Sequence, residues 1–198
     1  MGDKERLIKL IREYAFKYSD SPVFRLTSGL MSKYYFNLKK ITYTPEGQFL
    51  LGKLFYEKIK ELNLSPKAIG GLTLGADPIA IAVARYSYDV KDPIEAFVIR
   101  KEPKEHGMGL QIEGNVGPRD KVIIVDDVVT SGASTIKAIE IAEKYKLEII
   151  AVMALLDRCE QRGRENIEAK GYPFYSIVTV EDIKEQAAAI KEQATGNV

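Results

Sequence analysis

The chain has 198 residues and a mass of 22.2 kDa, and 29 lysines and arginines against 28 aspartates and glutamates leave a formal charge of +1. This balance argues against a general nucleic-acid-binding protein, which would carry a basic excess. One cysteine excludes an internal disulfide and a cysteine-only zinc site, and one histidine excludes a metal site built on two histidines. The length fits one domain, so we expect residues 1–198 to form a single domain.

Nothing in the sequence indicates export or insertion into a membrane. The longest apolar runs, such as residues 149–156, are far shorter than the ~20 residues that span a bilayer. The first ten residues mix both charges and have no apolar centre, unlike a signal peptide. We therefore expect a cytoplasmic protein that binds neither membranes nor nucleic acid.

Hydrophobic periodicity in the first sixty residues predicts two helices with short strands between them. Apolar residues recur at helical spacing over residues 7–18, and the segment 19–22, which ends in a proline, predicts the end of this helix. Short β-like runs follow at 23–26 and 34–38. Thr44 then predicts the N-cap of the second helix, with a proline in the first turn.

From residue 68 onward, strand patterns alternate with helical patterns. Strands are predicted at 68–74, 95–99, 121–125, 148–156 and 174–178, and helices at 77–86, 134–144, 161–170 and 180–193. This alternation predicts βαβ units and a parallel sheet, and the continuous apolar strands fit a sheet buried on both faces. The polar segment 100–119 has no helical or strand period, and long loops of this kind in compact domains are usually functional.

The strongest chemical signal is the segment VIIVDDVVTSGAS, residues 122–134. A buried strand leads to Asp126 and Asp127 and then to a turn of small and hydroxyl residues that opens a helix. Free backbone N–H groups and the helix dipole favour a phosphate at such a turn, and Gly132 permits its close approach. The two acids would repel a phosphate, so we expect them to hold neutral hydroxyls or a cation-bridged ligand. A sugar phosphate satisfies both demands; the alternative is that one aspartate merely caps the turn.

Four basic side chains lie close together in the segment RKEPKEHG: Arg100, Lys101, Lys104 and His106. Cations that close over a departing diphosphate stabilise its negative charge, most strongly where water is excluded. The alternative is a solvated charged loop, since two glutamates partly offset the cations. The position after a predicted strand, at the start of a loop containing glycines, favours the functional interpretation.

Arg158 follows the predicted strand 148–156, at the same sheet edge as the turn for phosphate. An arginine there can hold a planar carboxylate or a pyrimidine oxygen through two hydrogen bonds. The alternative is an ion pair with Asp157 or Glu160, and the sequence leaves both open.

These residues carry a resemblance to a known family. Residues 122–134 resemble the phosphoribosyl-pyrophosphate (PRPP) binding motif of type I phosphoribosyltransferases. Further segments resemble the orotate phosphoribosyltransferase family, and they are FRLTSGLMSKYYFN at 24–37, GGLTLGADPI at 70–79, the mobile catalytic loop RKEPKEHG at 100–107 and LDRCEQRG at 156–163. The resemblance therefore covers nearly the whole chain in order.

The resemblance implies an α/β fold with a central parallel sheet flanked by helices. It places this core at about residues 46–198, under a small N-terminal hood at about residues 1–45, with a mobile loop at about 100–119. The implied activity is transfer of the 5-phosphoribosyl group from PRPP to orotate in pyrimidine biosynthesis, with Mg²⁺ held mainly by the substrates. The resemblance also implies a homodimer in which loop 100–107 completes the neighbouring site.

Two alternative functions remain at this point. One is a PRPP-sensing regulator on the same fold, against which the sequence offers no nucleic-acid-binding extension and a net charge of only +1. The other is a purine or uracil phosphoribosyltransferase, which Arg158 and the loop 100–107 disfavour.

The resemblance assigns roles to named residues. Catalytic roles fall to Arg100, Lys101, Lys104, His106, Asp126 and Asp127. These six residues bind PRPP together with Val128, Val129, Thr130, Ser131, Gly132, Ala133 and Ser134. Orotate is held by Thr130, Arg158, Tyr35 and Phe36, although simple strand packing is an alternative role for the two aromatic residues.

This sequence departs from the family pattern at two positions. Many members carry a lysine around the turn that contains Thr27, and some carry one where this chain has Gly75. The cations that meet the diphosphate in the ground state are therefore an open question.

Overall fold

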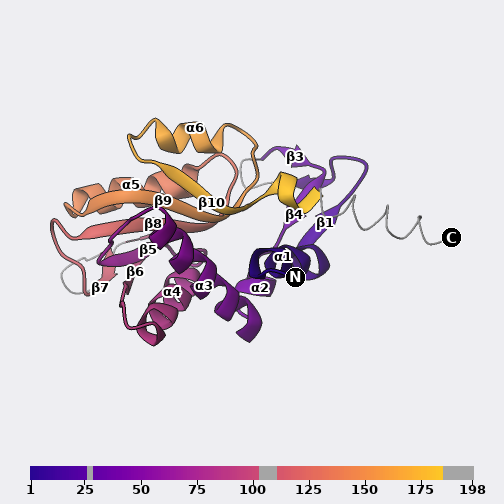
Figure 1. Cartoon of the computed structure of the whole chain (residues 1–198). Coiled ribbons are helices and arrows are strands. Elements are labelled where there is room, and N and C mark those ends of the chain that lie inside the picture. Colours follow the sequence, from indigo (N-terminus) through magenta and orange to yellow (C-terminus); the bar gives the residue numbers. More distant parts are fainter. Residues whose placement is uncertain (26–28, 103–110, 185–198) are drawn as a thin grey trace.

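The computed structural model describes residues 1–25, 29–102 and 111–184. At its centre lies a six-stranded sheet with the order β10-β9-β8-β5-β6-β7 (Figure 1). The strands are β5 (Ala68–Leu72), β6 (Glu95–Ile99), β7 (Ile112–Gly114), β8 (Lys121–Val129), β9 (Glu148–Asp157) and β10 (Phe174–Thr179). Neighbouring strands run parallel except β6 and β7, which are antiparallel. The predicted α/β fold with a central parallel sheet is confirmed.

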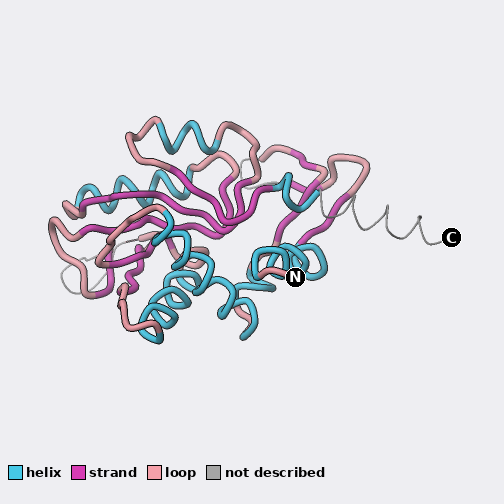
Figure 2. Tube along the Cα trace, in the orientation of Figure 1, coloured by secondary structure: helices cyan, strands magenta, loops and turns pink. Residues whose placement is uncertain are grey.

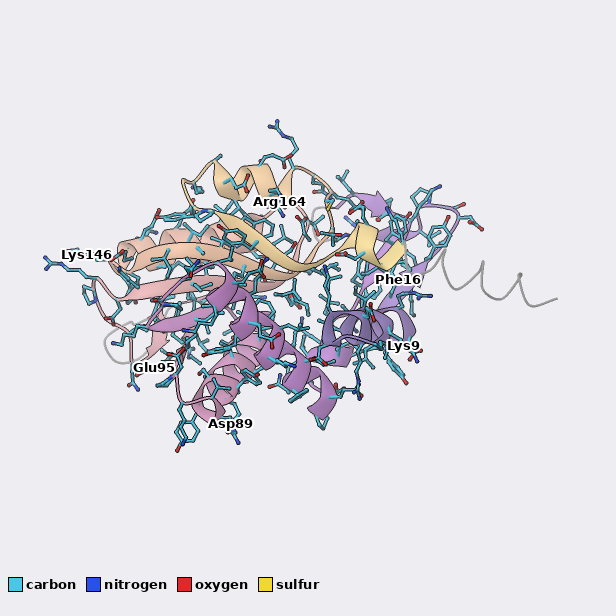
Figure 3. The ribbon with its side chains drawn as sticks, in the orientation of Figure 1. Lys9, Phe16, Asp89, Glu95, Lys146 and Arg164 are labelled. Atoms are coloured by element: carbon cyan, nitrogen blue, oxygen red, sulfur yellow. The ribbon has the colours of Figure 1, made fainter. Side chains whose placement is uncertain are left out.

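Helices cover both faces of this sheet (Figure 2). The helices α3 (Pro45–Glu61) and α4 (Asp77–Asp89) lie on one face, and α5 (Ala133–Lys144) and α6 (Gly163–Glu168) lie on the other. Side chains fill the space between the sheet and the helices (Figure 3). Along β8, Ile123 packs toward α3 and α4, whereas Ile124 packs toward α5. Burial on both faces explains the unbroken apolar runs of the strands.

The N-terminal part lies beside one end of the sheet (Figure 1). Its elements are α1 (Asp3–Leu10), the π-helix η1 (Ile11–Ala15), β1 (Phe16–Tyr18), β2 (Phe24–Arg25), β3 (Met31–Ser32), β4 (Tyr34–Phe36) and α2 (Lys39–Thr42). The strand β1 pairs with β4, and β2 pairs with β3, all antiparallel. Leu7 and Ile11 are buried in the same cluster as Ile123 of the sheet. The N-terminal helix therefore shares its core with the sheet, while the division into a hood and a core stays a prediction.

The prediction of a helix over residues 7–18 is wrong at its end. Helical structure stops at Ala15, and residues 16–18 form β1. Phe16 pairs with Phe36 across the ladder, and their ring centroids lie 5.1 Å apart. Contact with a strand twenty residues away thus overrides the local helical spacing.

The sequence suggested that the polar segment 100–119 has no regular structure, but part of it forms a strand. Residues 112–114 form β7, which lies antiparallel to β6 with Ile112 opposite Ile99. Three residues are too few for a periodic signal, so only the pairing reveals this strand. Residues 103–110 lie outside the described residues.

The bounds of other elements also differ from those predicted. The strand β8 extends to Val129, four residues beyond its predicted end, because it pairs with β9 as far as Asp157. The helix α6 begins at Gly163, since Gln161 and Arg162 adopt left-handed φ angles of 52° and 56°. The last predicted helix starts at residue 180, and residues 185–193 of it lie outside the described residues.

Thr44 caps α3 as predicted. Its hydroxyl accepts a hydrogen bond of 3.0 Å from the backbone N–H of Gly47. A search of the helices in the described part of the chain finds none with the length and apolar content needed to cross a bilayer.

Replacing Leu7 by alanine tests whether the N-terminal helix and the sheet unfold together. Leu7 is fully buried, so Leu7→Ala should lower the free energy of unfolding by about 2–5 kcal/mol in one cooperative transition. Urea unfolding followed by circular dichroism and tyrosine fluorescence measures this loss. The control Tyr14→Ala changes an exposed side chain of η1 and should cost less than about 0.5 kcal/mol. Two separate transitions would contradict the predicted single domain.

Candidate active site

A cleft of about 610 Å³ lies at the carboxyl ends of β5, β8 and β9. The N-terminal part supplies Arg25 and residues 35–39, and the loop after β5 supplies residues 72–75. The end of β8 and the turn after it supply most of residues 126–135. In open parallel sheets, ligands bind at this edge because the helices that follow the strands begin there.

Two buried carboxylates form the floor of the cleft. Asp126 accepts a hydrogen bond of 2.9 Å from the Thr135 hydroxyl and one of 3.0 Å from the backbone N–H of Asp127. Burial, followed by the neighbouring charge of Asp127, raises the pKa of Asp126 to about 7. The Nζ atom of Lys39 lies 3.4 Å from Oδ2 of Asp127. One acid is therefore held by neutral donors and the other by an ammonium group.

The backbone at Gly75 closes against both acids. A Cβ atom at this position would lie 2.7 Å from a carboxylate oxygen of Asp127 and 2.9 Å from one of Asp126. Any side chain at residue 75 would therefore have to displace the carboxylates. This contact gives a physical reason for the absence of a lysine here.

The turn after β8 opens α5 in the way that the sequence predicts. Gly132 is the N-cap and has a left-handed φ of 79°, which glycine adopts without strain. The side-chain amide of Asn166 donates a 3.0 Å hydrogen bond to the carbonyl of Ser131 and so fixes the turn to α6. The first N–H groups of α5 have no partner within the helix and are available to an anion.

Arg158 reaches the cleft from the end of β9. Its guanidinium is nearly buried and contacts the Ser32 hydroxyl at 3.0 Å and a Glu160 carboxylate oxygen at 2.9 Å. Burial lowers the pKa of Arg158, and the charge of Glu160 opposes this shift. Within the described residues, the Nε atom of Arg158 is buried and has no hydrogen-bond partner. A buried donor of this kind is costly unless a ligand satisfies it.

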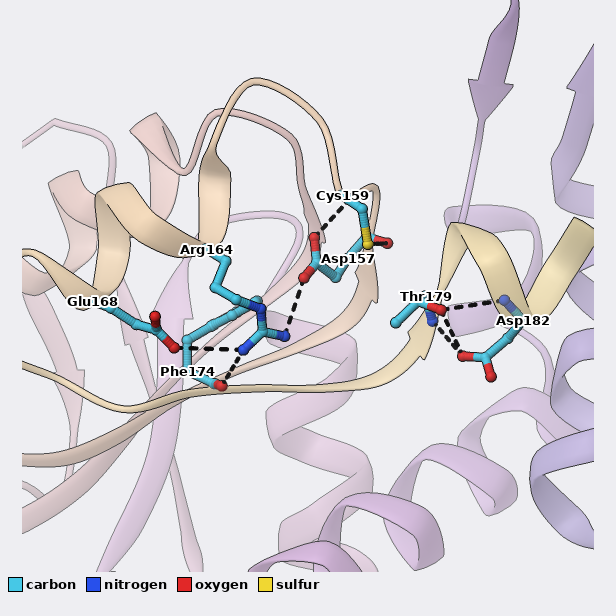
Figure 4. A network of polar contacts seen from close by, with 7 residues as sticks. All are labelled: Asp157, Cys159, Arg164, Glu168, Phe174, Thr179 and Asp182. Atoms are coloured by element: carbon cyan, nitrogen blue, oxygen red, sulfur yellow. Dashed lines mark hydrogen bonds and ion pairs between the residues drawn. The ribbon is translucent and has the colours of Figure 1, made fainter.

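Asp157 is not the ion-pair partner of Arg158. It accepts hydrogen bonds from Arg164 at 3.2 Å and from the backbone N–H of Cys159 at 2.8 Å (Figure 4). Arg164 also donates to the carbonyl of Phe174 at 2.8 Å, which ties α6 to β10. Of the two ion pairs that the sequence left open, the one with Glu160 forms.

The aromatic pair of β4 is packed against other rings and also faces the cleft, so its predicted contact with orotate stays a prediction. Tyr35 and Phe36 line the cleft, and both also pack against other rings of the N-terminal part. The guanidinium carbon of Arg158 lies 5.5 Å from the ring centre of Phe36. The ring can therefore position the arginine as well as contact a ligand.

The structure brings most of the predicted site residues together. Those that line the cleft are Tyr35, Phe36, Lys101, Asp126, Asp127, Val128, Thr130, Ser131, Gly132, Ala133, Ser134 and Arg158.

Of the predicted site residues that the structure describes, Arg100 and Val129 are not among those that line the cleft. Arg100 forms an ion pair of 3.6 Å with Glu113 of β7. The side chain of Val129 is buried in the core beneath α5, and the predicted contact of this residue with PRPP stays a prediction. Lys104 and His106 lie outside the described residues.

Several residues that line the cleft are not among the predicted site residues, and three of them carry a cationic or hydroxyl group that bears on its chemistry. Arg25 and Lys39 come from the N-terminal part, and Thr135 lies one residue beyond the predicted turn. The Thr135 hydroxyl continues the run of small polar residues, which could have indicated its role. No sequence signal joins Lys39 to an acid 88 positions away.

Comparisons with known proteins agree with this geometry. A family model described as a phosphoribosyl transferase domain matches residues 37–190. The orotate phosphoribosyltransferase of Aquifex aeolicus is 50% identical over 183 residues, which are 92% of this chain and 98% of that protein. That of Pyrococcus horikoshii is 39% identical over 98% of this chain and 100% of that protein. The crystal structure of the Mycobacterium tuberculosis orotate phosphoribosyltransferase in complex with PRPP has a TM-score of 0.74 and 30% identity, over 92% of this chain and 99% of that chain.

The raised pKa of Asp126 predicts that stability depends on pH. A carboxyl group has a pKa of about 3.9 in an unfolded chain, so between about pH 4 and 7 the folded protein binds a proton that the unfolded chain does not. Its contribution to stability is therefore greatest at low pH and is lost as the pH rises toward 7.

Urea unfolding of the Asp126→Asn variant at pH 5 and pH 8 measures this contribution. The wild-type protein should lose more stability than the variant between these values, because only the wild type releases the proton. Glu57→Gln, which removes a surface carboxylate of α3, is the control and should keep the wild-type dependence. An equal dependence in wild type and Asp126→Asn would contradict the proposed burial of this acid.

Proposed function

The chain belongs to the phosphoribosyltransferases, and within them to the orotate phosphoribosyltransferase family, and from this premise we propose how its cleft acts. The enzyme transfers the 5-phosphoribosyl group of PRPP to orotate, which gives orotidine 5′-monophosphate and diphosphate. One observation supports the assignment of this reaction to the cleft. The cleft brings together a turn suited to phosphate, two buried carboxylates and a buried arginine whose Nε has no partner among the described residues.

The phosphoribosyl group lies along the end of β8 and the start of α5 in this proposal. Residues 130–134 hold the 5′-phosphate through backbone N–H groups and hydroxyls. Asp126 and Asp127 then accept hydrogen bonds from the ribose hydroxyls. As the bond from the anomeric carbon to diphosphate breaks, the sugar gains oxocarbenium character, and the nearby carboxylates stabilise its positive charge.

The departing diphosphate requires cations on the opposite side of the sugar. Lys101 lines the cleft and is placed to meet it. The family resemblance adds Arg100, Lys104 and His106, which with Lys101 stabilise the charge that develops on the leaving group. The near-zero net charge of the chain does not oppose this role, because acids and cations are separated along the sequence.

Orotate binds beside Arg158 in this proposal. The Nε atom of Arg158, which has no hydrogen-bond partner among the described residues, is a donor that suits a carboxylate or a ring carbonyl. The ring of Phe36 and the exposed part of Tyr35 offer apolar surface to the pyrimidine, and Thr130 offers a hydroxyl. These contacts favour orotate over a purine because the orotate carboxylate can accept a hydrogen bond from the buried Nε of Arg158.

We expect Mg²⁺ to accompany PRPP, as is typical of this family. A search of the described residues finds no cluster of three or more side chains that could hold a metal ion. Two carboxylates beside a sugar site fit an ion that takes most of its ligands from diphosphate, ribose oxygens and water. When bound, the ion supplies positive charge that the diphosphate needs as it leaves.

We also propose that the enzyme works as a homodimer. Four apolar side chains of α3, α4 and the loop before α4 are 57–73% exposed, namely Phe49, Leu74, Ile81 and Tyr88. Leu74 also lines the cleft, so a second copy that covers Leu74 would lie beside the site. A second copy that covers it would bring its own loop 100–107 toward the neighbouring cleft, as the family resemblance implies.

A turnover assay with PRPP and Mg²⁺ tests the substrate. We expect product with orotate and little or none with uracil, hypoxanthine or adenine, because only orotate carries the carboxylate that Arg158 fits. Release of diphosphate and formation of the nucleotide are both measured. Turnover of a purine without turnover of orotate would contradict the assignment, and binding of PRPP without any turnover would favour a regulator.

Complementation between two inactive variants tests the shared site. Lys104→Ala and Asp127→Asn are mixed in equal amounts and allowed to exchange subunits. Random exchange makes half of the dimers heterodimers, which contain one subunit of each variant. Each heterodimer has one intact site of its two, so about a quarter of the wild-type activity should return. Each variant alone is the control, and no recovery after proven exchange would contradict a loop that serves the neighbouring subunit.

A further inference from the structure

We propose that Lys39 is a binding residue for the diphosphate of PRPP, and that it passes from Asp127 to the diphosphate when the donor binds. The inference rests on the proposed placement of PRPP. It concerns the question that the sequence left open, namely which cation meets the diphosphate in the ground state. Lys39 belongs to neither the predicted loop nor the turn after β8.

The backbone that carries Lys39 is firmly held. Lys39 opens the short helix α2, in which Ile41 and Thr42 are buried, and it follows Leu38, which is also buried. Leu38 and Ile41 belong to the cluster that includes the sheet. The lysine stem therefore starts from a fixed point at the rim of the cleft, and only its side chain is free to move.

The contact with Asp127 leaves the ammonium group accessible. The Nζ atom lies 3.4 Å from Oδ2 of Asp127, and the side chain of Lys39 is 48% exposed, against 12% for Asp127. This distance is long for a charge-assisted hydrogen bond, which is usually 2.7–2.9 Å. An ammonium on a flexible four-carbon stem can exchange such a contact for a stronger one without movement of the backbone.

The arrival of PRPP changes the balance of charge around this pair. Ribose hydroxyls would donate to Asp127 and take over the role of its cation. The diphosphate carries several negative charges, whereas Asp127 carries one, so the ammonium gains by moving to it. Asp127 is then left with neutral hydrogen-bond donors, and Asp126 already has only neutral donors in the described structure.

Arg25 and Lys101 also line the cleft, but within the described residues neither contacts Asp126 or Asp127. A side chain at residue 75 would collide with both carboxylates, so the loop after β5 contributes backbone alone. Arg158 is nearly buried and is held by Glu160 and Ser32. Across the described parts of the chain, Lys39 is the one cleft-lining cation in contact with either carboxylate of the pair.

Binding measurements with two ligands separate this role from a purely structural one. The ligands are PRPP and ribose 5-phosphate, each with Mg²⁺ and the full-length enzyme, and calorimetry gives the dissociation constants. Lys39→Met should weaken PRPP binding by about tenfold, equivalent to the loss of one ion pair of about 1.4 kcal/mol, and change ribose 5-phosphate binding by less than about twofold. If Lys39 only orients Asp127, both ligands should weaken equally, and that result would overturn the inference.

Steady-state kinetics provide the second measurement. Lys39→Met should raise the KM for PRPP by about tenfold while kcat and the KM for orotate change by less than about twofold, because the contact already exists in the ground state. Lys39→Arg should restore most of the PRPP affinity. Lys40→Met removes the neighbouring exposed lysine and serves as the matched control, with wild-type values expected. Unchanged PRPP binding in Lys39→Met, with a native circular dichroism spectrum, would overturn the inference.

The wild-type enzyme distinguishes this inference from the proposed function. If the wild-type protein turns over orotate and Lys39→Met behaves like Lys40→Met, only the role of Lys39 is overturned. A wild-type protein that binds no PRPP overturns the placement of the donor, and the inference with it.

Discussion

The burial of two adjacent carboxylates at the end of β8 is the constraint on which the rest of the site depends. Two acids side by side in a strand repel each other, and burial removes the water that would screen them. The Thr135 hydroxyl and a backbone N–H stabilise Asp126, and the Lys39 ammonium group stabilises Asp127. It also keeps residue 75 without a side chain, because the backbone there lies against both carboxylates. In the proposed reaction, these acids accept hydrogen bonds from the ribose hydroxyls and face the positive charge that develops on the sugar.

The sheet and the N-terminal part together surround these acids. The strands bring the turn after β8 and Arg158 to one edge, because parallel strands share the direction of their carboxyl ends. The N-terminal part adds the aromatic residues of β4 and the lysine of α2 from the other side. Its helix α1 is buried against the same core, so the two walls of the cleft are held in a fixed relation. The proposed reaction uses this separation, since it places phosphate, sugar and pyrimidine against different groups of the cleft.

Much of the fold and of the site could be predicted from residues whose signals are local. The apolar runs at 121–125 and 148–156 predicted buried strands, and Thr44 predicted a helix start. Elements formed by pairing were missed or misplaced. Phe16 lies in a strand because Phe36 faces it, and Ile112 lies in a strand because Ile99 faces it. In the same way, the strand predicted to end at residue 125 continues to Val129, because pairing with β9 extends it and buries that side chain.

The sequence by itself determined the parallel sheet, the family and most of the residues that line the cleft. These follow from the hydrophobic periodicity, the motifs and the turn residues, and each of these signals depends on residues that are near one another in the chain. Only the tertiary structure decided that Arg158 pairs with Glu160, that Gly75 touches both acids and that Lys39 reaches Asp127. Such contacts join positions that are brought together by folding, and their energies depend on burial and distance, which no spacing in the sequence records.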